Sequence, residues 1–160
     1  MTSFTWDNKF NTGIDALDVQ NRKIIDYMTM LHNEIVDVRQ KCESLNNQFD
    51  QLTLLCQMHF MDEERLMDEM NYPLAAEHKR LHDLFLATVD RFKVENNQCH
   101  TVGILNDFNN LRGDFITHML NETLLLSDFI KSRPCGDLAE TAYYVTATGA
   151  TREGGTYQRR

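Results

Sequence analysis

The stretch HFMDEERLMDEMNYPLAAEHKRLH, residues 59–82, carries the pattern that decides the fold. Two pairs of polar side chains recur in it with a spacing of four, His59 with Glu63 and His78 with His82. Residues four apart lie on the same face of an α-helix, and a proline between the two pairs ends the first helix. The stretch therefore predicts two helices joined by a short turn, each presenting a pair of potential metal ligands on one face.

Outside this stretch, apolar residues continue to repeat at spacings of three and four, which indicates amphipathic helices. Only two prolines and seven glycines occur in the chain, a composition that favours long helices over strands. The periodic segments cover residues 17–42, 47–70, 74–94 and 102–131. Because the links between them are short, we expect an all-α fold, an up-down-up-down four-helix bundle with a metal site in its core.

The chain divides into a bundle and a tail. We expect the four-helix bundle to occupy residues 1–134. The remaining residues, 135–160, are rich in threonine and glycine and poor in large apolar side chains. Such a segment cannot bury enough apolar surface to offset the entropy of ordering, so we expect a flexible C-terminal tail.

Composition excludes several classes of partner. The formal net charge of −8 comes without a cluster of lysine and arginine, so nucleic acid is not an expected partner. No apolar run approaches the roughly 20 residues that cross a bilayer, and the N-terminus lacks the apolar stretch of a signal peptide. We therefore expect a cytoplasmic protein with no membrane partner. The four cysteines form no Cys-x-x-Cys pair, so a thiolate zinc site is not predicted.

The most informative polar residues are those that stand on apolar stripes. His118 and Glu122 form a third pair with a spacing of four, on the last predicted helix. Burying an isolated charge costs several kcal/mol, and a metal ion would satisfy all three pairs together. Imidazole and carboxylate in combination suit iron or zinc better than calcium or magnesium. The alternative is a hydrogen-bonded polar cluster without a metal.

Longer motifs surround these pairs. They are GIDALDVQN at residues 13–21, HFMDEERLM at 59–67, NYPLAAEHKRLH at 71–82 and ITHM at 116–119. Together with an early Trp6, they resemble the single-domain bacterial members of the hemerythrin family over about residues 6–131. The resemblance implies a four-helix bundle that holds two irons, bridged by two carboxylates and an oxo or hydroxo group, and that binds dioxygen reversibly.

Five residues match the family's ligand motif position by position. By the resemblance, His59 would be a terminal ligand of one iron and Glu63 would bridge both irons. His78, His82 and His118 would complete the second iron.

Two positions depart from that motif. After Gln20, where the family has histidine, this chain has Asn21, whose amide is a weak neutral ligand. Five residues after His118, where the family has a bridging aspartate, it has Thr123. Glu122 lies on the His118 face of a regular helix, and our hypothesis is that it supplies the second bridge without a helix bulge. A site with one iron instead of two is the alternative.

Three functions are compatible with these patterns. The first is a non-haem iron protein, mononuclear or di-iron, that binds dioxygen or a related small ligand for oxygen storage, delivery or sensing. The second is a degenerate regulatory or interaction module with a mononuclear or absent metal site and a protein partner. An enzyme is disfavoured, because di-iron oxidases use Glu-x-x-His pairs and this chain has none. Slow peroxidase or nitric-oxide chemistry is the enzymatic possibility that stays open.

Overall fold

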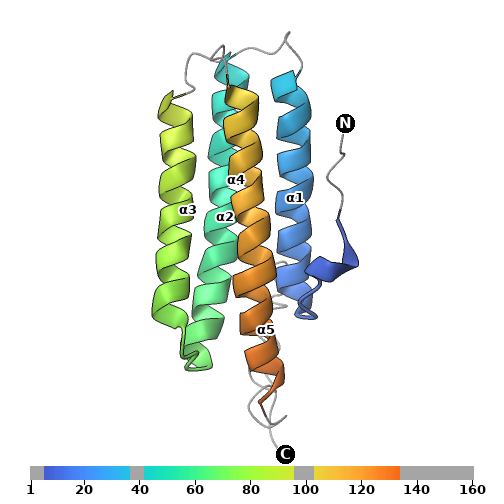
Figure 1. Ribbon diagram of the computed structural model, residues 1–160, viewed down its shortest axis with the longest axis vertical. Coiled ribbons are helices and arrows are strands. Elements are labelled where there is room, and N and C mark those ends of the chain that lie inside the picture. The colour runs from blue at the N-terminus through green and yellow to red at the C-terminus, as the bar shows by residue number, and fades with distance from the viewer. Residues whose placement is uncertain (1–5, 37–41, 96–102, 134–160) are drawn as a thin grey trace, which may run out of the picture.

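The chain folds into a bundle of four helical rods that lie side by side (Figure 1). The first three rods are single helices, and the fourth consists of consecutive helical segments. The computed structural model describes residues 6–36, 42–95 and 103–133. After a short 3-10 helix η1, three long helices are followed by a fourth rod made of three consecutive segments. The elements are η1 (Asn8–Phe10), α1 (Asp15–Val36), α2 (Cys42–Glu69), α3 (Ala75–Glu95), α4 (Ile104–His118), η2 (Met119–Thr123) and α5 (Leu124–Lys131). The predicted all-α, four-helix bundle is confirmed.

The boundary between the first two helices differs from the prediction. The sequence pattern extended the first helix to Cys42 and began the second at Asn47, whereas Cys42 is the first residue of α2. No glycine or proline marks this link, so the apolar spacing runs through it without a visible break. The predicted flexible tail, residues 135–160, lies outside the described residues.

The fourth rod is not one regular α-helix. Its segment η2 is a π-helix, in which the Leu124 N–H donates to the Met119 carbonyl five residues earlier. The expectation that the helix continues past His118 without a bulge was therefore wrong. Because a π turn accommodates an extra residue, it changes which of Glu122 and Thr123 faces the core.

Two apolar clusters fill the bundle. The larger is built around buried aromatic and aliphatic side chains that include Phe49, Phe60, Phe85, Phe108, Phe115 and Met119. The smaller lies at the other end and includes Leu17, Leu66, Met67, Met70, Leu126 and Ile130. On α2, Glu63 falls between Phe60 of the larger cluster and Leu66 of the smaller one. A layer of buried polar side chains therefore separates the two clusters.

The start of α1 is fixed by a hydrogen-bonded loop. The Asp18 carboxylate accepts from the Thr12 backbone N–H and hydroxyl, both at 2.7 Å, and from the Gly13 N–H at 3.0 Å. Gly13 adopts a φ of 73°, which a residue without a side chain reaches at no steric cost. The Ser127 hydroxyl of α5 donates to the Thr12 carbonyl, which ties this loop to the last helix. These contacts set the position of α1 against the rest of the bundle.

None of the helices that the structure describes is long and apolar enough to cross a membrane.

Candidate metal centre

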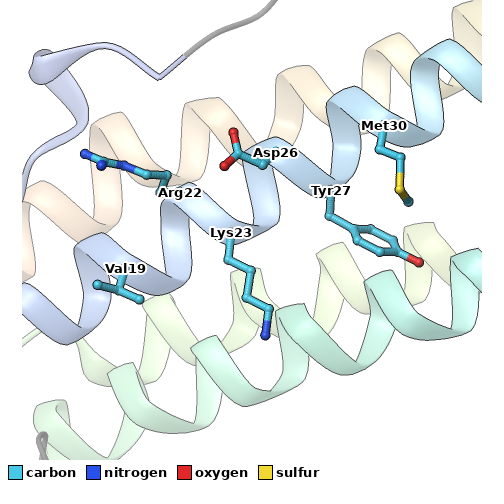
Figure 2. Close-up of a pocket in the computed structure, with 6 residues that line it drawn as sticks. All are labelled: Val19, Arg22, Lys23, Asp26, Tyr27 and Met30. Carbon is cyan, nitrogen blue, oxygen red and sulfur yellow. The ribbon is translucent and has the colours of Figure 1, made fainter.

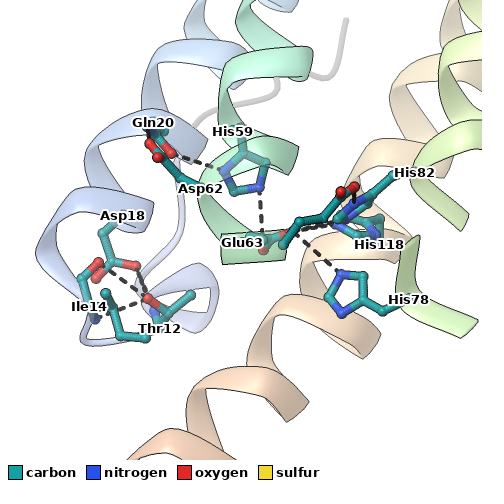
Figure 3. Close-up of polar contacts among 11 residues, drawn as sticks. Thr12, Ile14, Asp18, Gln20, His59, Asp62, Glu63, His78, His82 and His118 are labelled. Atoms are coloured by element: carbon teal, nitrogen blue, oxygen red, sulfur yellow. Dashed lines mark hydrogen bonds and ion pairs between the residues drawn. The ribbon is translucent and has the colours of Figure 1, made fainter. Parts of the chain in front are cut away.

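Four buried side chains from three helices converge in the polar layer. They are Glu63 of α2, His78 and His82 of α3, and His118 of α4. Each offers one ligand atom, and these four atoms all lie within 4.8 Å of one another. Figure 3 shows the three imidazoles gathered around the carboxylate. The spacing of four places each α3 histidine one turn from the other, so both rings reach the same point.

The Glu63 carboxylate stands at the centre of this group, with its two oxygens facing different histidines. Its Oε2 lies 3.0 Å from the His82 Nε2, 3.2 Å from the His118 Nε2 and 3.4 Å from the His78 Nε2. Its Oε1 lies 3.5 Å from the His59 Nε2. The carboxylate therefore separates a pocket with three imidazoles from a position with one.

The surroundings favour an ionised Glu63 and a neutral His59. Burial alone would raise the pKa of Glu63, but His59 and the three imidazoles at Oε2 outweigh it and hold the pKa well below its usual range. Burial lowers the pKa of His59 to about 4, despite the opposing charge of Glu63. Both groups are thus in the protonation state that a metal ligand needs.

Hydrogen bonds behind two of the histidines orient their rings. The Gln20 side chain donates to the Asp62 carboxylate at 2.6 Å, which leaves its carbonyl oxygen 3.3 Å from the His59 Nδ1. The neutral His59 ring therefore carries its proton on Nδ1 and directs the lone pair of Nε2 at Glu63. The His82 Nδ1 similarly faces the Glu64 carboxylate at 2.9 Å. Such outer partners fix the tautomer and raise the basicity of metal-binding histidines.

Apolar side chains shield the group on the side of the larger cluster. The Phe60 ring stacks on the His82 ring with centroids 4.0 Å apart and planes 9° from parallel. The Phe115 ring lies 6.0 Å from that of His59 and is fully buried. Cys56 is also buried, and burial raises the pKa of its thiol, so it stays a protonated packing group. Aromatic and other apolar side chains therefore border the group on this side.

The buried atoms fit a cation. The His59 Nε2, the Glu63 Oε1 and the His78 Nε2 are buried and have no hydrogen-bond partner. Unpaired polar atoms in a protein interior are costly, and here they are electron-pair donors that face one another. A metal ion between them would satisfy several donors at once. Three imidazoles with a carboxylate are ligands that iron and zinc both accept.

The structure brings together five of the six residues predicted from the sequence. Glu122 is outside the group: its side chain is partly exposed and its charge contributes, after burial, to a raised pKa of Tyr72. The π-helix turns the next residue, Thr123, into the core instead, where its hydroxyl is fully buried and unpartnered. Asn21 is fully buried as expected, and both polar atoms of its amide lack a partner.

The outer partners were missed by the sequence reasoning. Gln20, Asp62 and Glu64 are half-buried residues of amphipathic helices, where polar side chains are usual. The sequence gives one signal that could have found them, which is their position. Each of the three residues directly precedes or follows a buried polar residue in the sequence.

A separate pocket lies on the outer surface of α1. Its lining, drawn in Figure 2, consists of Val19, Arg22, Lys23, Asp26, Tyr27 and Met30. None of the six predicted site residues lines it. Its lining side chains carry mixed charges and all come from one face of α1. They therefore do not converge on one point as metal ligands would.

Fold and site together define a four-helix bundle protein whose core contains a buried group of three histidines and a carboxylate suited to a cation. Residues 12–129 match the family model described as the hemerythrin HHE cation binding domain. The chain therefore belongs to the hemerythrin family, as its motifs predicted.

Relatives along most of the chain carry the name bacteriohemerythrin. The protein of Stenotrophomonas maltophilia is 30% identical over 121 residues, which cover 71% of this chain and 78% of the relative. That of Pseudomonas paraeruginosa is 27% identical over 145 residues, with coverage of 85% and 92%. That of Clostridium acetobutylicum is 29% identical over 97 residues, with coverage of 58% and 73%.

Proposed function

We propose that this chain is a non-haem iron protein that binds dioxygen or a related small ligand. Glu63, His78, His82 and His118 would hold the iron, with His59 at the other oxygen of Glu63. The observation that carries the proposal is the convergence of three buried imidazoles on one buried carboxylate. Family membership supports iron over zinc as the resident metal.

The residues around the site suit reversible ligand binding. Four protein ligands leave positions free on an iron ion, which commonly takes up to six. Iron supplies the affinity for a small ligand, and the chain supplies orientation and exclusion of water. Gln20 and Glu64 hold the histidine rings in place, and the Phe60 ring stacks on that of His82. Because the whole group is buried, we propose a diatomic ligand and not a large substrate.

Oxygen storage, delivery or sensing is the role that such a site serves best. We propose a binding protein and not an enzyme, in line with the relatives named bacteriohemerythrin. Slow turnover with peroxide that disappears in His82→Ala would be the minimum support for an enzymatic role.

Anaerobic reconstitution with iron, followed by absorption spectra before and after air, tests the proposal. We expect bound iron and an oxygen-dependent near-ultraviolet band that reverses when oxygen is removed. His82→Ala should lose both, whereas His32→Ala, on a partly exposed position of α1, should keep them. Bound iron that never responds to air would refute dioxygen binding.

A second candidate rests on Asn21 and Thr123. Because both replace charged or imidazole ligands of the family, the chain is also compatible with a regulatory or interaction module that retains a reduced metal site. Iron without any response to dioxygen, nitric oxide or azide would favour this second function.

A further inference from the structure

Several buried groups at the level of the polar layer have polar atoms without a hydrogen-bond partner. Asn21 and Thr123 are fully buried, as is His59, and all three have unpartnered polar atoms. The fourth donor is the Oε1 of Glu63, which is likewise buried and unpartnered. Buried polar atoms of a native protein normally have a partner, so this set indicates a missing one.

The sequence of each helix places Asn21 and Thr123 in the polar layer. On α1, Asn21 lies between Leu17 of the smaller cluster and Ile24 of the larger one. Thr123 lies between Met119 of the larger cluster and Leu126 of the smaller one. Both therefore stand at the level of Glu63, which divides the same two clusters on α2.

The backbone supports this placement. Gln20, the neighbour of Asn21, contacts the His59 ring, so this part of α1 is adjacent to the site. The π-helix η2 follows His118 directly, and Thr123 is its buried last residue. Asn21 therefore lies on α1 and Thr123 on the fourth rod, and α1 packs against α4 of that rod.

The two sides of Glu63 differ strongly in ligand strength. One side has three imidazoles and a carboxylate oxygen, which together form a strong ligand set for iron or zinc. The other has one imidazole, the second oxygen of the same carboxylate, an amide and a hydroxyl. Neutral amide and hydroxyl oxygens bind such cations weakly. The negative charge of Glu63 is shared, and it mainly stabilises the ion on the side with three imidazoles.

We propose that this chain retains one metal ion, held by Glu63, His78, His82 and His118, and that any ion between His59 and Glu63 exchanges freely with solvent. This proposal deepens the proposed function, because it assigns the permanent metal to one side of the carboxylate. The other side becomes a position of neutral hydrogen-bonding groups beside that metal, suited to a water molecule, a small ligand or a transient second cation. The full pair of irons implied by the family does not fit Asn21 and Thr123.

Zinc stoichiometry tests the proposal without any redox chemistry. The full-length, metal-free chain is titrated with Zn²⁺, passed through a desalting column in metal-free buffer, and analysed for zinc per chain. We expect one zinc to remain. Two zinc ions retained by the wild-type chain, or none, would overturn the proposal.

A pair of substitutions tests its physical cause. Asn21→His together with Thr123→Asp supplies the imidazole and carboxylate that the second position lacks, and should raise the retained zinc from one to two per chain. The matched control makes the same changes at surface positions, Asn110→His and Thr88→Asp, and should stay at one. A folded Asn21→His/Thr123→Asp chain that retains only one zinc would overturn the cause assigned here.

The zinc count is independent of the dioxygen test. A wild-type chain that retains two zinc ions and still responds to air would refute unequal positions while leaving dioxygen binding intact. One retained zinc with an iron form that is inert to air would refute dioxygen binding and leave the unequal positions standing.

Discussion

Acidification should destabilise the metal-free chain through His59. Its pKa falls from an ordinary 6.5 to about 4 on folding, because the ring is fully buried. Between these values the unfolded chain binds a proton that the folded chain does not, so the free energy of unfolding falls as the pH falls below 6.5. The loss worked from the two pKa values is about 2 kcal/mol at pH 5 and about 3 kcal/mol at pH 4. Above pH 6.5 the effect vanishes.

Urea denaturation of the metal-free protein, followed by far-ultraviolet circular dichroism, measures this loss. The free energy of unfolding is compared at pH 7.5 and pH 5 for the wild-type chain and for His59→Leu, which keeps a buried side chain but removes the titrating group. We expect the wild-type chain to lose about 2 kcal/mol more than the variant over this interval. Equal losses would show that His59 is not buried as a neutral ring, and would refute the reasoning.

Three further predictions concern outer partners, packing and the sixth predicted ligand. Glu64→Gln should weaken metal binding by about 10- to 100-fold in a chelator competition, while Glu77→Gln on the exposed face of α3 should not change it. Phe108→Ala should lower the free energy of unfolding, measured by urea denaturation, by about 3–5 kcal/mol, because the Phe108 ring is fully buried. The control Leu84→Ala removes an exposed side chain and should lower it by about 0.5 kcal/mol or less. Because Glu122 lies outside the group, Glu122→Ala should keep its metal content and absorption spectrum; a loss of metal would support the bridging role predicted from the sequence.

The helices that carry the buried histidines and Glu63 could be predicted because two spacings in the sequence agree. The apolar stripe repeats every three or four residues, and the polar pairs repeat every four, so both fix the same helix face. His78 and His82 on α3 are the plainest case, since Pro73 marks the turn before them in the sequence, and Asn71 in that turn adopts a positive φ of 50°. The family resemblance then supplied the expected role of each residue.

The fourth rod could not be predicted in the same way. The segment Met119–Thr123 contains no glycine or proline, so nothing in its composition distinguishes a π turn from a regular α-helix. The choice between the two depends on packing: a regular helix would direct the charged Glu122 at the core, whereas the π turn buries the smaller, neutral Thr123. Burying a hydroxyl costs less than burying a carboxylate, and this tertiary balance is invisible to local spacing.

The outer hydrogen bonds depend on tertiary structure as well. Gln20 and Asp62 lie 42 residues apart in the chain and meet only because α1 packs against α2. Spacing within one helix carries no information about such a pair. The buried histidines and Glu63 were thus predictable from local pattern as one group, whereas the side chains that contact them from outside were not.

The location of the metal itself is the most direct test of the account. Crystals of the iron-reconstituted chain, measured at the iron absorption edge, show by anomalous scattering where each iron lies and how fully it is occupied. We predict one strong peak bound by Glu63, His78, His82 and His118, with a weak peak or none between Glu63 and His59. Two peaks of equal strength would contradict the unequal positions, and iron bound through other side chains would contradict the site itself.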